Sequence, residues 1–590
     1  MLAIRRIPSR LAPLTRRNNS TARLLPQTLR AQCHRPQVAL NPDVAKAINN
    51  NILSLDQPNN LRRVAKNNFL RLQTENLHRA PFTSLEVDAH IASIFVQNYA
   101  SVYQTLMELK KRMSSRGKVW MPDKVLDVGF GPATGIVALN DIFQDVEFKP
   151  RLKDAVILGS LDMQRKAKII LSRQRHEVVD AKDDEDSIPR EEIVDEVDVA
   201  AAADQDDLIG EVMTKKIKTV TRLSGRLPVK NKYDLIIVTQ QLLQHESKFN
   251  TQVDENLEKF LKLLAPGGHI VIIERGNPLG FEIVAKARQI MIRPENYPDE
   301  HGKIPRPWLR GVQMENSEAP TPMEHNYYLN IVAPCPHHRK CPLQTGNPHF
   351  YSFKEGKDLK TCTFQKSIER PKFNMELKRG KLLATEWNDE EGARPSRDLR
   401  GTGRPNGRNY EIVNYSYLIA ERSLADKETI SKIEQMREEQ LHNFEIGSLG
   451  DNTPDTWPRI ISQPIKRKGH VILDLCAPSG KLEKWTIPKS FSKEIYHDAR
   501  KAMKGDLWGL DAKTKIKGRG SLNVTKFENL EKERIKQTKK ESRVKERELA
   551  ETFNQLSNDE LEIDEQSVEK IETLSTIYGH YYEDAEKKGN

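Results

Sequence analysis

A glycine-rich loop that directly follows a short apolar strand is the feature that most constrains the fold of this chain. The sequence reads Val125-Leu-Asp-Val-Gly-Phe-Gly-Pro-Ala-Thr-Gly135, and an apolar segment with helical periodicity comes next. Gly129, Gly131 and Gly135 allow tight turning and close approach of the backbone to a ligand. The spacing G-x-G-x-x-x-G differs from the dinucleotide fingerprint G-x-G-x-x-G. Strand, loop and helix together predict the start of a Rossmann-like α/β domain.

Strands and helices alternate after this loop. Strands are predicted at 124–128, 155–158, 233–239 and 269–274, and helices at 136–143, from about 161, at 256–264 and from about 281. This alternation predicts a parallel, doubly wound sheet, with the domain spanning 119–293. Residues 43–118, with apolar side chains at helical spacing between Ile91 and Leu109, predict a helical region before the sheet.

The glycine loop and two later segments resemble motifs of class I S-adenosylmethionine methyltransferases. The later segments are Tyr233-Asp-Leu-Ile-Ile-Val-Thr239 and Leu264-Ala-Pro-Gly-Gly-His-Ile-Val-Ile-Ile273, in the order that this family has. The resemblance implies a methyltransferase-like fold with an S-adenosylmethionine site. It implies the following cofactor-binding residues: Asp127, Gly129, Gly131, Gly135, Thr239 and Gln240.

Two departures from this pattern leave enzymatic activity open. Methyltransferases usually place an acidic residue at the end of the second strand to bind the ribose, but Leu158 and Gly159 stand there. After the fourth strand, Thr239-Gln-Gln-Leu-Leu243 replaces the Asn/Asp-Pro-Pro-aromatic signature of base N-methyltransferases. The sequence therefore predicts the fold but identifies no catalytic residue, since a fold does not imply a function.

A cluster of cysteines predicts a metal site. Ala333-Pro-Cys-Pro-His-His-Arg-Lys-Cys-Pro342 contains Cys335 and Cys341, and Cys362 follows twenty-one residues later. The chain has five cysteines, too few and too dispersed for a disulfide scaffold. Zinc accepts four thiolates or three thiolates and an imidazole, whereas a cubane iron–sulfur cluster needs four thiolates. The candidates for the fourth ligand are Cys476, His337, His338 and His349.

An ordered set of motifs resembles one particular family. The motifs are Cys335-Pro-His-His-Arg-Lys-Cys-Pro342, Thr361-Cys-Thr-Phe-Gln365, Asn414-Tyr-Ser-Tyr-Leu-Ile-Ala-Glu-Arg422, Trp457-Pro-Arg-Ile-Ile-Ser-Gln-Pro464 and Gly505-Asp-Leu-Trp508. Over about residues 80–510 the chain resembles the methyltransferase-like assembly family of the mitochondrial ribosomal small subunit, called Rsm-twenty-two in fungi.

This resemblance implies a ligand set and partners. It implies a [4Fe-4S] cluster, with zinc as the alternative, held by Cys335, Cys341, Cys362 and Cys476. It also implies binding to small-subunit ribosomal RNA and ribosomal proteins in the mitochondrial matrix. Two other functions stay open: an active S-adenosylmethionine-dependent rRNA methyltransferase, and a stable structural subunit of the mitochondrial ribosome.

The N-terminus has the composition of a mitochondrial transit peptide. Residues 1–42 contain eight arginines, and the first acidic residue of the chain is Asp43. An Arg-rich, acid-free leader without a continuous apolar run is typical of such peptides. An RNA-binding basic arm is the alternative. No apolar run approaches the roughly 20 residues that a transmembrane helix needs, so no such helix is predicted.

Charge divides the rest of the chain, whose formal net charge is +11. Fourteen Asp and Glu residues between 177 and 207 predict a disordered insert at 176–229. Residues 294–515 are predicted to form the iron–sulfur and RNA-binding region, and 516–590 a charged helical or disordered tail. Fourteen Lys/Arg against six Asp/Glu in 461–520 favour phosphate binding. Three interleaved aromatic residues could stack on unpaired bases, but for each of them a place in the core beneath a solvated basic surface is the favoured interpretation: Trp485, Tyr496 and Trp508.

A second loop resembles a cofactor site but is predicted not to be one. Val471-Ile-Leu-Asp-Leu-Cys-Ala-Pro-Ser-Gly-Lys481 is similar to the loop of RNA cytosine-C5 methyltransferases. No alternating series of strands and helices follows it, and the chain is highly charged from about 520. We therefore expect this loop to present Cys476 to the metal.

Overall fold

The computed structural model describes residues 23–177, 208–209, 212–292, 327–379, 408–518 and 524–558. The first 22 residues of the predicted transit peptide, most of the predicted acidic insert and the end of the predicted tail lie outside these ranges. The chain divides into two compact units, 1–521 and 522–590, and each is described by itself.

Helices precede the sheet, as the sequence predicts. They are α1 (Pro26–Ala31), α2 (Pro42–Asn51), α3 (Pro58–Thr74), α4 (Ser84–His90) and α5 (Val96–Ser115), with a π-helical turn at Ile91–Phe95. Thr83 caps α4, because its side chain accepts a hydrogen bond from the backbone N–H of Glu86. In return, the side chain of Glu86 accepts a hydrogen bond from the backbone N–H of Thr83. The apolar stripe along α5 is buried.

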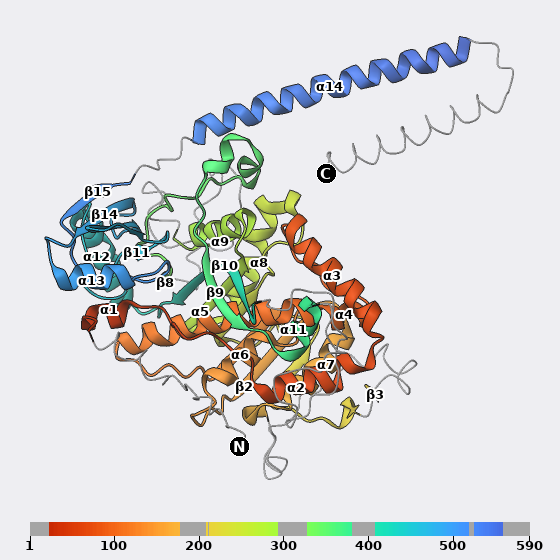
Figure 1. The fold of residues 1–590 in the computed structure, drawn as a ribbon, viewed down its shortest axis with the longest axis horizontal. Coiled ribbons are helices and arrows are strands. Elements are labelled where there is room, and N and C mark those ends of the chain that lie inside the picture. Colours follow the sequence, from red (N-terminus) through yellow and green to blue (C-terminus); the bar gives the residue numbers. More distant parts are fainter. Residues whose placement is uncertain are drawn as a thin grey trace, which may run out of the picture. The chain divides into compact units, whose positions relative to one another are not determined.

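The first unit is built around an eight-stranded sheet (Figure 1). Its strands run in the order β5-β2-β1-β6-β7-β10-β8, and β9 pairs with β10. The strands are β1 (Lys124–Gly129), β2 (Leu152–Ile157), β5 (Arg222–Ser224), β6 (Tyr233–Thr239), β7 (Leu264–Arg275), β8 (Leu329–Ala333), β9 (Phe364–Glu369) and β10 (Tyr410–Arg422). A short hairpin of β3 (Leu208–Ile209) and β4 (Val212–Met213) lies outside this sheet.

Strand direction confirms the α/β part of the predicted fold class, with its parallel sheet. The five strands from β5 to β7 pair in parallel, and β10 is antiparallel to both β7 and β8. A parallel sheet with one reversed strand inserted before the last is the arrangement of class I S-adenosylmethionine methyltransferases. Strand β1 is buried along its length, as expected for a strand covered on both faces.

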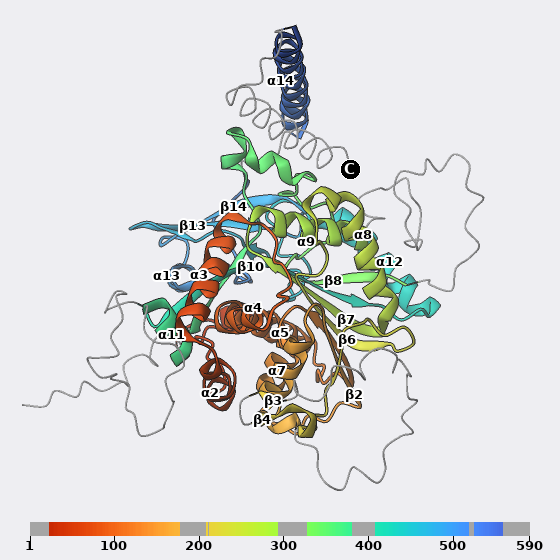
Figure 2. The ribbon, with the colours of Figure 1, turned by 90° about the vertical axis from the view of Figure 1, so that its right-hand side faces the viewer.

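Helices cover both faces of the sheet (Figure 2). Helices α5, α6 (Thr134–Ile142) and α7 (Leu161–Leu171) pack on one face, and α8 (Phe249–Leu263) and α9 (Pro278–Met291) on the other. Neighbouring β1 residues alternate between the two cores, with Val125 in the first and Leu126 in the second.

A second, smaller sheet is entirely antiparallel. It contains β11 (Arg459–Ile460), β12 (Ile465–Lys466), β13 (His470–Cys476), β14 (Leu482–Pro488) and β15 (Thr514–Lys517). Helix α13 (Lys493–Lys501) contributes to its core. The segment 471–481, which is similar to the loop of RNA cytosine-C5 methyltransferases, therefore consists of most of β13 and the turn to the antiparallel β14. This agrees with the prediction that it is not a second cofactor loop.

The aromatic residues of the basic segment 461–520 are core residues. Trp485 and Trp508 are 0% and 2% exposed, and Tyr496 is buried with them in the core of the small sheet. Their burial excludes base stacking and confirms the favoured interpretation, core aromatic residues beneath a basic surface. Trp485 alternates with exposed or half-buried residues of β14 because successive side chains of a strand point to opposite faces.

The end of the predicted insert 176–229 and the end of the predicted leader 1–42 both belong to the fold. β5 lies within the predicted insert 176–229, yet it pairs in parallel with β2 at the sheet edge. Residues 23–42, assigned to the predicted leader, also make specific contacts. The hydroxyl of Thr28 donates to Asp498 at 2.6 Å, and Val38 forms a bridge with Ile368 of β9. Composition could not show these contacts, which depend on residues hundreds of positions away.

The second unit contains α14 (Val524–Asn558), a helix of 35 residues within the predicted charged tail. Between β10 and β11 the first unit also carries α12 (Lys427–Asn443), and α11 (Lys372–Arg379) follows β9. Among the described residues, no helix combines the length and apolar character needed to span a membrane.

Candidate functional site

The glycine loop folds onto Asp127. The Asp127 carboxylate accepts hydrogen bonds from the backbone N–H of Gly135 at 2.7 Å and of Ile136 at 3.3 Å. A Cβ at position 135 would lie 2.4 Å from Asp127 Oδ1, so only glycine fits there. The sequence therefore needs the glycine to bring the start of α6 against the carboxylate.

Burial sets the acidity of Asp127. Its side chain is enclosed, and desolvation raises its pKa from 3.8 to about 7, although the N–H groups of Gly135 and Ile136 oppose the shift. The Asp127 side chain thus holds the glycine loop to the start of α6 through these two hydrogen bonds.

The structure brings most of the predicted cofactor residues around one small cavity. Asp127, Gly129, Gly131 and Thr239 line it, together with Asn98 from α5 and residues 155–157 of β2. Gly135 and Gln240 are not in its lining. Gln240 lies beside it, because its side-chain amide donates to Asn98 at 3.1 Å.

Polar atoms without partners face this region. In the part of the chain that the structure describes, Thr134 Oγ1, Thr239 Oγ1 and His90 Nε2 are buried and have no hydrogen-bond partner. Buried polar groups are normally satisfied, so these three mark a place where a small polar ligand would gain contacts.

The residues fit part of S-adenosylmethionine but not all of it. The free volume is about 10 Å³, against roughly 300–1,000 Å³ for small-molecule pockets. A Cβ at Gly159, beyond the end of β2, would lie 3.0 Å from the Cβ of Ala80. The segment before α4 therefore packs against the strand end where a methyltransferase holds the ribose. The end of β2 also carries no acidic residue to bind a ribose. The chain therefore keeps the glycine loop of a methyltransferase, while the place where the ribose would lie is covered by the segment before α4.

Four cysteines line a second, mainly apolar cavity between the two sheets. Cys335 follows β8, Cys341 lies in the next loop, Cys362 precedes β9 and Cys476 ends β13. Helix α9 supplies part of the wall through Phe281, Ala285 and Arg288. Residues from four separate places in the chain thus converge on one space.

The thiols influence one another. Burial, and after it the neighbouring Cys335, raise the pKa of Cys341 to about 11, although Arg288 lowers it. Burial also raises the pKa of Cys362 and of Cys476, and the nearby Cys335 and Cys341 add to the rise. Because burial and neighbouring thiolates disfavour their charged forms, Cys341, Cys362 and Cys476 stay protonated without a ligand. A bound cation would reverse this and release protons.

The histidine alternatives for the fourth ligand are less suitable than Cys476. His338 Nε2 accepts a hydrogen bond from the backbone N–H of Ile331 at 2.9 Å. His337 lies 3.3 Å from Cys476 Sγ, but its other ring nitrogen is 3.2 Å from Arg288. His349 is outside the lining of the cavity.

Within the described ranges, no three His, Cys, Asp or Glu side chains are grouped closely enough to hold one metal ion. A zinc ion requires all its ligands about 2.0–2.3 Å from one point. The shared cavity nevertheless places four sulfur donors around one space, which is the donor set of a cubane iron–sulfur group.

Buried polar side chains hold the thiol-bearing segments in place. Glu282 of α9 accepts hydrogen bonds from the backbone N–H groups of Thr345 and Gly346, and from the Tyr351 hydroxyl, at 2.9–3.0 Å. Arg459 donates to the carbonyl of Pro334 at 2.6 Å and to Glu108 at 2.7 Å. Sequence reasoning missed both roles, although Arg459 lies inside the Trp457–Pro464 motif.

Relatives with known names share most of this chain. Residues 84–304 and 392–509 match the family described as "Mitochondrial small ribosomal subunit Rsm22". The chain is 58% identical over 570 residues to "Ribosome assembly protein RSM22, mitochondrial" of Saccharomyces cerevisiae, covering 95% of this chain and 90% of that protein. It is 26% identical over 294 residues to "Rsm22-cox11 tandem protein 2, mitochondrial" of Schizosaccharomyces pombe, covering 49% and 31%.

Among solved structures, the plantazolicin methyltransferase BpumL matches with a TM-score of 0.20 and 11% identity, covering 38% of this chain and 63% of that one. The CcbJ methyltransferase from Streptomyces caelestis matches with a TM-score of 0.15 and 14% identity, covering 32% and 60%. These scores are too low to carry an argument. The extent and identity of the sequence matches, by contrast, show that the chain belongs to the Rsm22 family of the mitochondrial small ribosomal subunit.

Proposed function

We propose that this chain assists assembly of the mitochondrial small ribosomal subunit, in the matrix, by binding its rRNA and ribosomal proteins, and so supports mitochondrial translation. The observation that carries the proposal is the 58% identity, over 95% of the chain, to a protein named as a mitochondrial ribosome assembly protein. The net charge of +11 supports a polyanionic partner.

A binding role is favoured over methyl transfer by the geometry of the glycine loop. The loop keeps its shape around Asp127, but the free volume beside it is about 10 Å³. Ala80 packs against Gly159 at the end of β2. The methyltransferase fold would then act as a scaffold.

We propose further that Cys335, Cys341, Cys362 and Cys476 hold a [4Fe-4S] cluster, with zinc as the alternative. Their convergence on one cavity supports this. Such a cluster would link the large sheet to the small one through Cys476. Its binding free energy would then stabilise the folded arrangement of both.

Depletion of the chain from mitochondria tests the assembly role. We expect small ribosomal subunits to fall while large subunits persist in a sedimentation profile. The chain itself should sediment with small-subunit precursors at substoichiometric amounts and be absent from mature ribosomes. Unchanged small subunits after depletion would refute the proposal.

A permanent ribosomal subunit is the second candidate, because the family description names a small ribosomal subunit. Quantitative mass spectrometry of mature ribosomes separates the two. One copy per mature small subunit would establish the structural role instead.

Calorimetric titration of the purified full-length chain with S-adenosylmethionine tests the enzymatic alternative. We expect no measurable binding up to about 1 mM, the weak end of ordinary affinities. Binding in the micromolar range would reopen methyl transfer.

Anaerobic purification with metal analysis tests the cluster. Iron with sulfide, and absorbance near roughly 400 nm, is expected, whereas a colourless zinc protein would contradict it.

A further inference from the structure

Helix α3 carries positive charge without any negative charge. Its sequence, PNNLRRVAKNNFLRLQT, contains Arg62, Arg63, Lys66 and Arg71 and no Asp or Glu. Leu61 and Ala65 are buried and fix the helix to the fold. The polar side chains therefore belong to an anchored helix with a defined outward surface.

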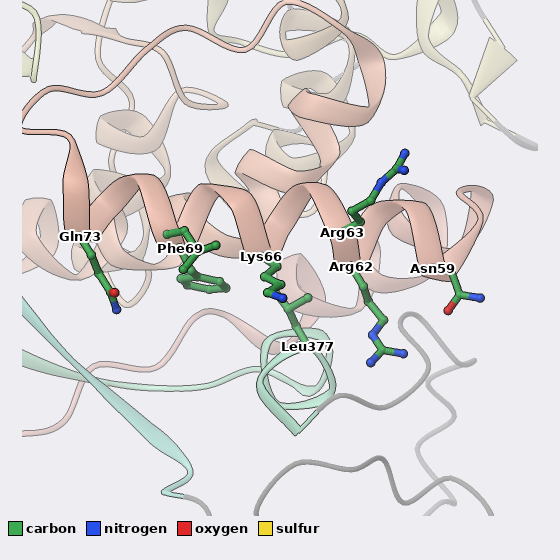
Figure 3. Close-up of a pocket in the computed structure, with 8 residues that line it drawn as sticks. Asn59, Arg62, Arg63, Lys66, Phe69, Gln73 and Leu377 are labelled. Carbon is green, nitrogen blue, oxygen red and sulfur yellow. The ribbon is translucent and has the colours of Figure 1, made fainter.

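One stripe of this helix faces an open groove of about 570 Å³. The groove is lined on the α3 side mainly by residues at alternating spacings of three and four, and Leu377 of α11 lies opposite. The members of this stripe are Asn59, Arg62, Lys66, Phe69 and Gln73. Figure 3 shows their side chains on the side of α3 toward Leu377, whereas the side chain of Arg63 points away.

The cations of the stripe are not neutralised. Across the described ranges, neither Arg62 nor Lys66 has a carboxylate partner, and Lys66 is exposed. Two buried cations of the described residues, by contrast, are paired: Lys166 with Asp88 at 2.7 Å and Arg459 with Glu108 at 2.7 Å. The groove thus offers two positive charges to an external anion.

We propose that the groove between α3 and α11 binds a single-stranded segment of RNA; this inference rests on the proposed function and names a surface for it. Arg62 and Lys66 contact phosphates, Asn59 and Gln73 hydrogen-bond sugar hydroxyls or base edges, and Phe69 packs against an unpaired base. The stripe is about 21 Å long at 1.5 Å per residue, so it follows several nucleotides.

An acidic peptide is the competing occupant, and the composition of the stripe favours RNA. Carboxylates would engage only the two cations. RNA also uses the amides, which donate and accept hydrogen bonds as base edges and 2′-hydroxyls do, and the aromatic ring between them.

Binding of the full-length chain to an unstructured RNA oligonucleotide tests the groove. The double variant Arg62→Gln/Lys66→Gln should weaken binding at least about 10-fold. It should also lower the slope of log affinity against log salt by about 1.4, since each phosphate contact on a single strand contributes about 0.7. Lys248→Gln/Lys259→Gln changes two exposed lysines, one just before α8 and one on it. This pair removes the same charge and should change binding less than about 2-fold.

Two further readouts keep the result specific. Arg62→Lys/Lys66→Arg preserves both charges and should bind within about 3-fold of the wild type. Ultraviolet crosslinking should mark the tryptic peptide Asn67–Arg71, which contains Phe69. If the wild type binds RNA while the glutamine pair binds equally well, the groove is wrong and the proposed function stands.

Two other outcomes would overturn the proposed function or the assignment of RNA as the ligand of the groove. If the wild type binds no RNA and does not sediment with small-subunit precursors, the proposed function fails. If an acidic peptide of equal charge binds as tightly as RNA and depends equally on Arg62 and Lys66, the occupant is a protein segment and the RNA assignment is overturned.

Discussion

At the scale of single residues, one carboxylate ties three segments together. Glu108 of α5 lies between two guanidinium groups, accepting from Arg112 at 3.1 Å and from Arg459 at 2.7 Å. Arg459 also holds Pro334, next to Cys335. Burial alone would raise the pKa of Glu108, but Arg459 and Arg112 lower it from 4.5 to about 2. This residue therefore connects α5 with the strand that leads to the thiol cavity.

Glu108→Gln should destabilise the first unit by about 3–5 kcal/mol, because it leaves buried guanidinium charge uncompensated. The wild-type contribution is present above pH 4.5 and is lost as the pH falls through about 2. Urea unfolding at pH 7 and at low pH measures both effects. The exposed Glu255→Gln is the control; equal stabilities of the two variants would refute the role of Glu108.

Asp127 has the opposite pH dependence. Its folded-state pKa is raised to about 7, so its contribution is full below pH 3.8 and is lost as the pH rises through 7. Asp127→Asn should therefore gain stability relative to the wild type between about pH 4 and 8. Thermal unfolding across that range checks it. A pH-independent difference between the two proteins would contradict the buried-carboxylate account.

At the scale of elements, sequence patterns predicted what depends on local periodicity. The strand at Tyr233–Thr239 was placed at its observed bounds, and β1 within one residue. The three-residue β5 was missed because a short edge strand has no periodicity to detect. For Trp485 and Trp508 the sequence left base stacking open beside the favoured core position, because only tertiary packing shows that both rings are buried. The covering of Gly159 by Ala80 likewise depends on a contact between distant segments.

Helix α9 supports the thiol cavity without donating a ligand. Glu282 holds the loop after Cys341 through Thr345, Gly346 and Tyr351. Glu282→Ala leaves these buried donors unsatisfied, at about 1–3 kcal/mol each. We expect metal content to fall by half or more in anaerobically purified protein, while Glu255→Ala keeps the wild-type content. Full metal content in Glu282→Ala would show that the loop needs no such support.

At the scale of the whole first unit, the glycine loop and the thiol cavity occupy different places. The glycine loop lies at the carboxyl end of β1, and the thiol cavity joins α9 and the ends of β8, β9 and β13. In the proposed function, the surfaces that the thiol-bearing segments organise carry assembly. The methyltransferase-like sheet supports these surfaces.

The most direct measurement is the ratio of small to large ribosomal subunits in mitochondria whose only copy of the chain is a variant. Gly129→Ala adds a methyl group at ordinary contact distance, 3.7 Å from Thr239, and fills the residual cofactor space. Cys362→Ser removes one thiol from the shared cavity. We predict a near-normal ratio with Gly129→Ala and loss of small subunits with Cys362→Ser. Loss with Gly129→Ala and a normal ratio with Cys362→Ser would contradict the central claim.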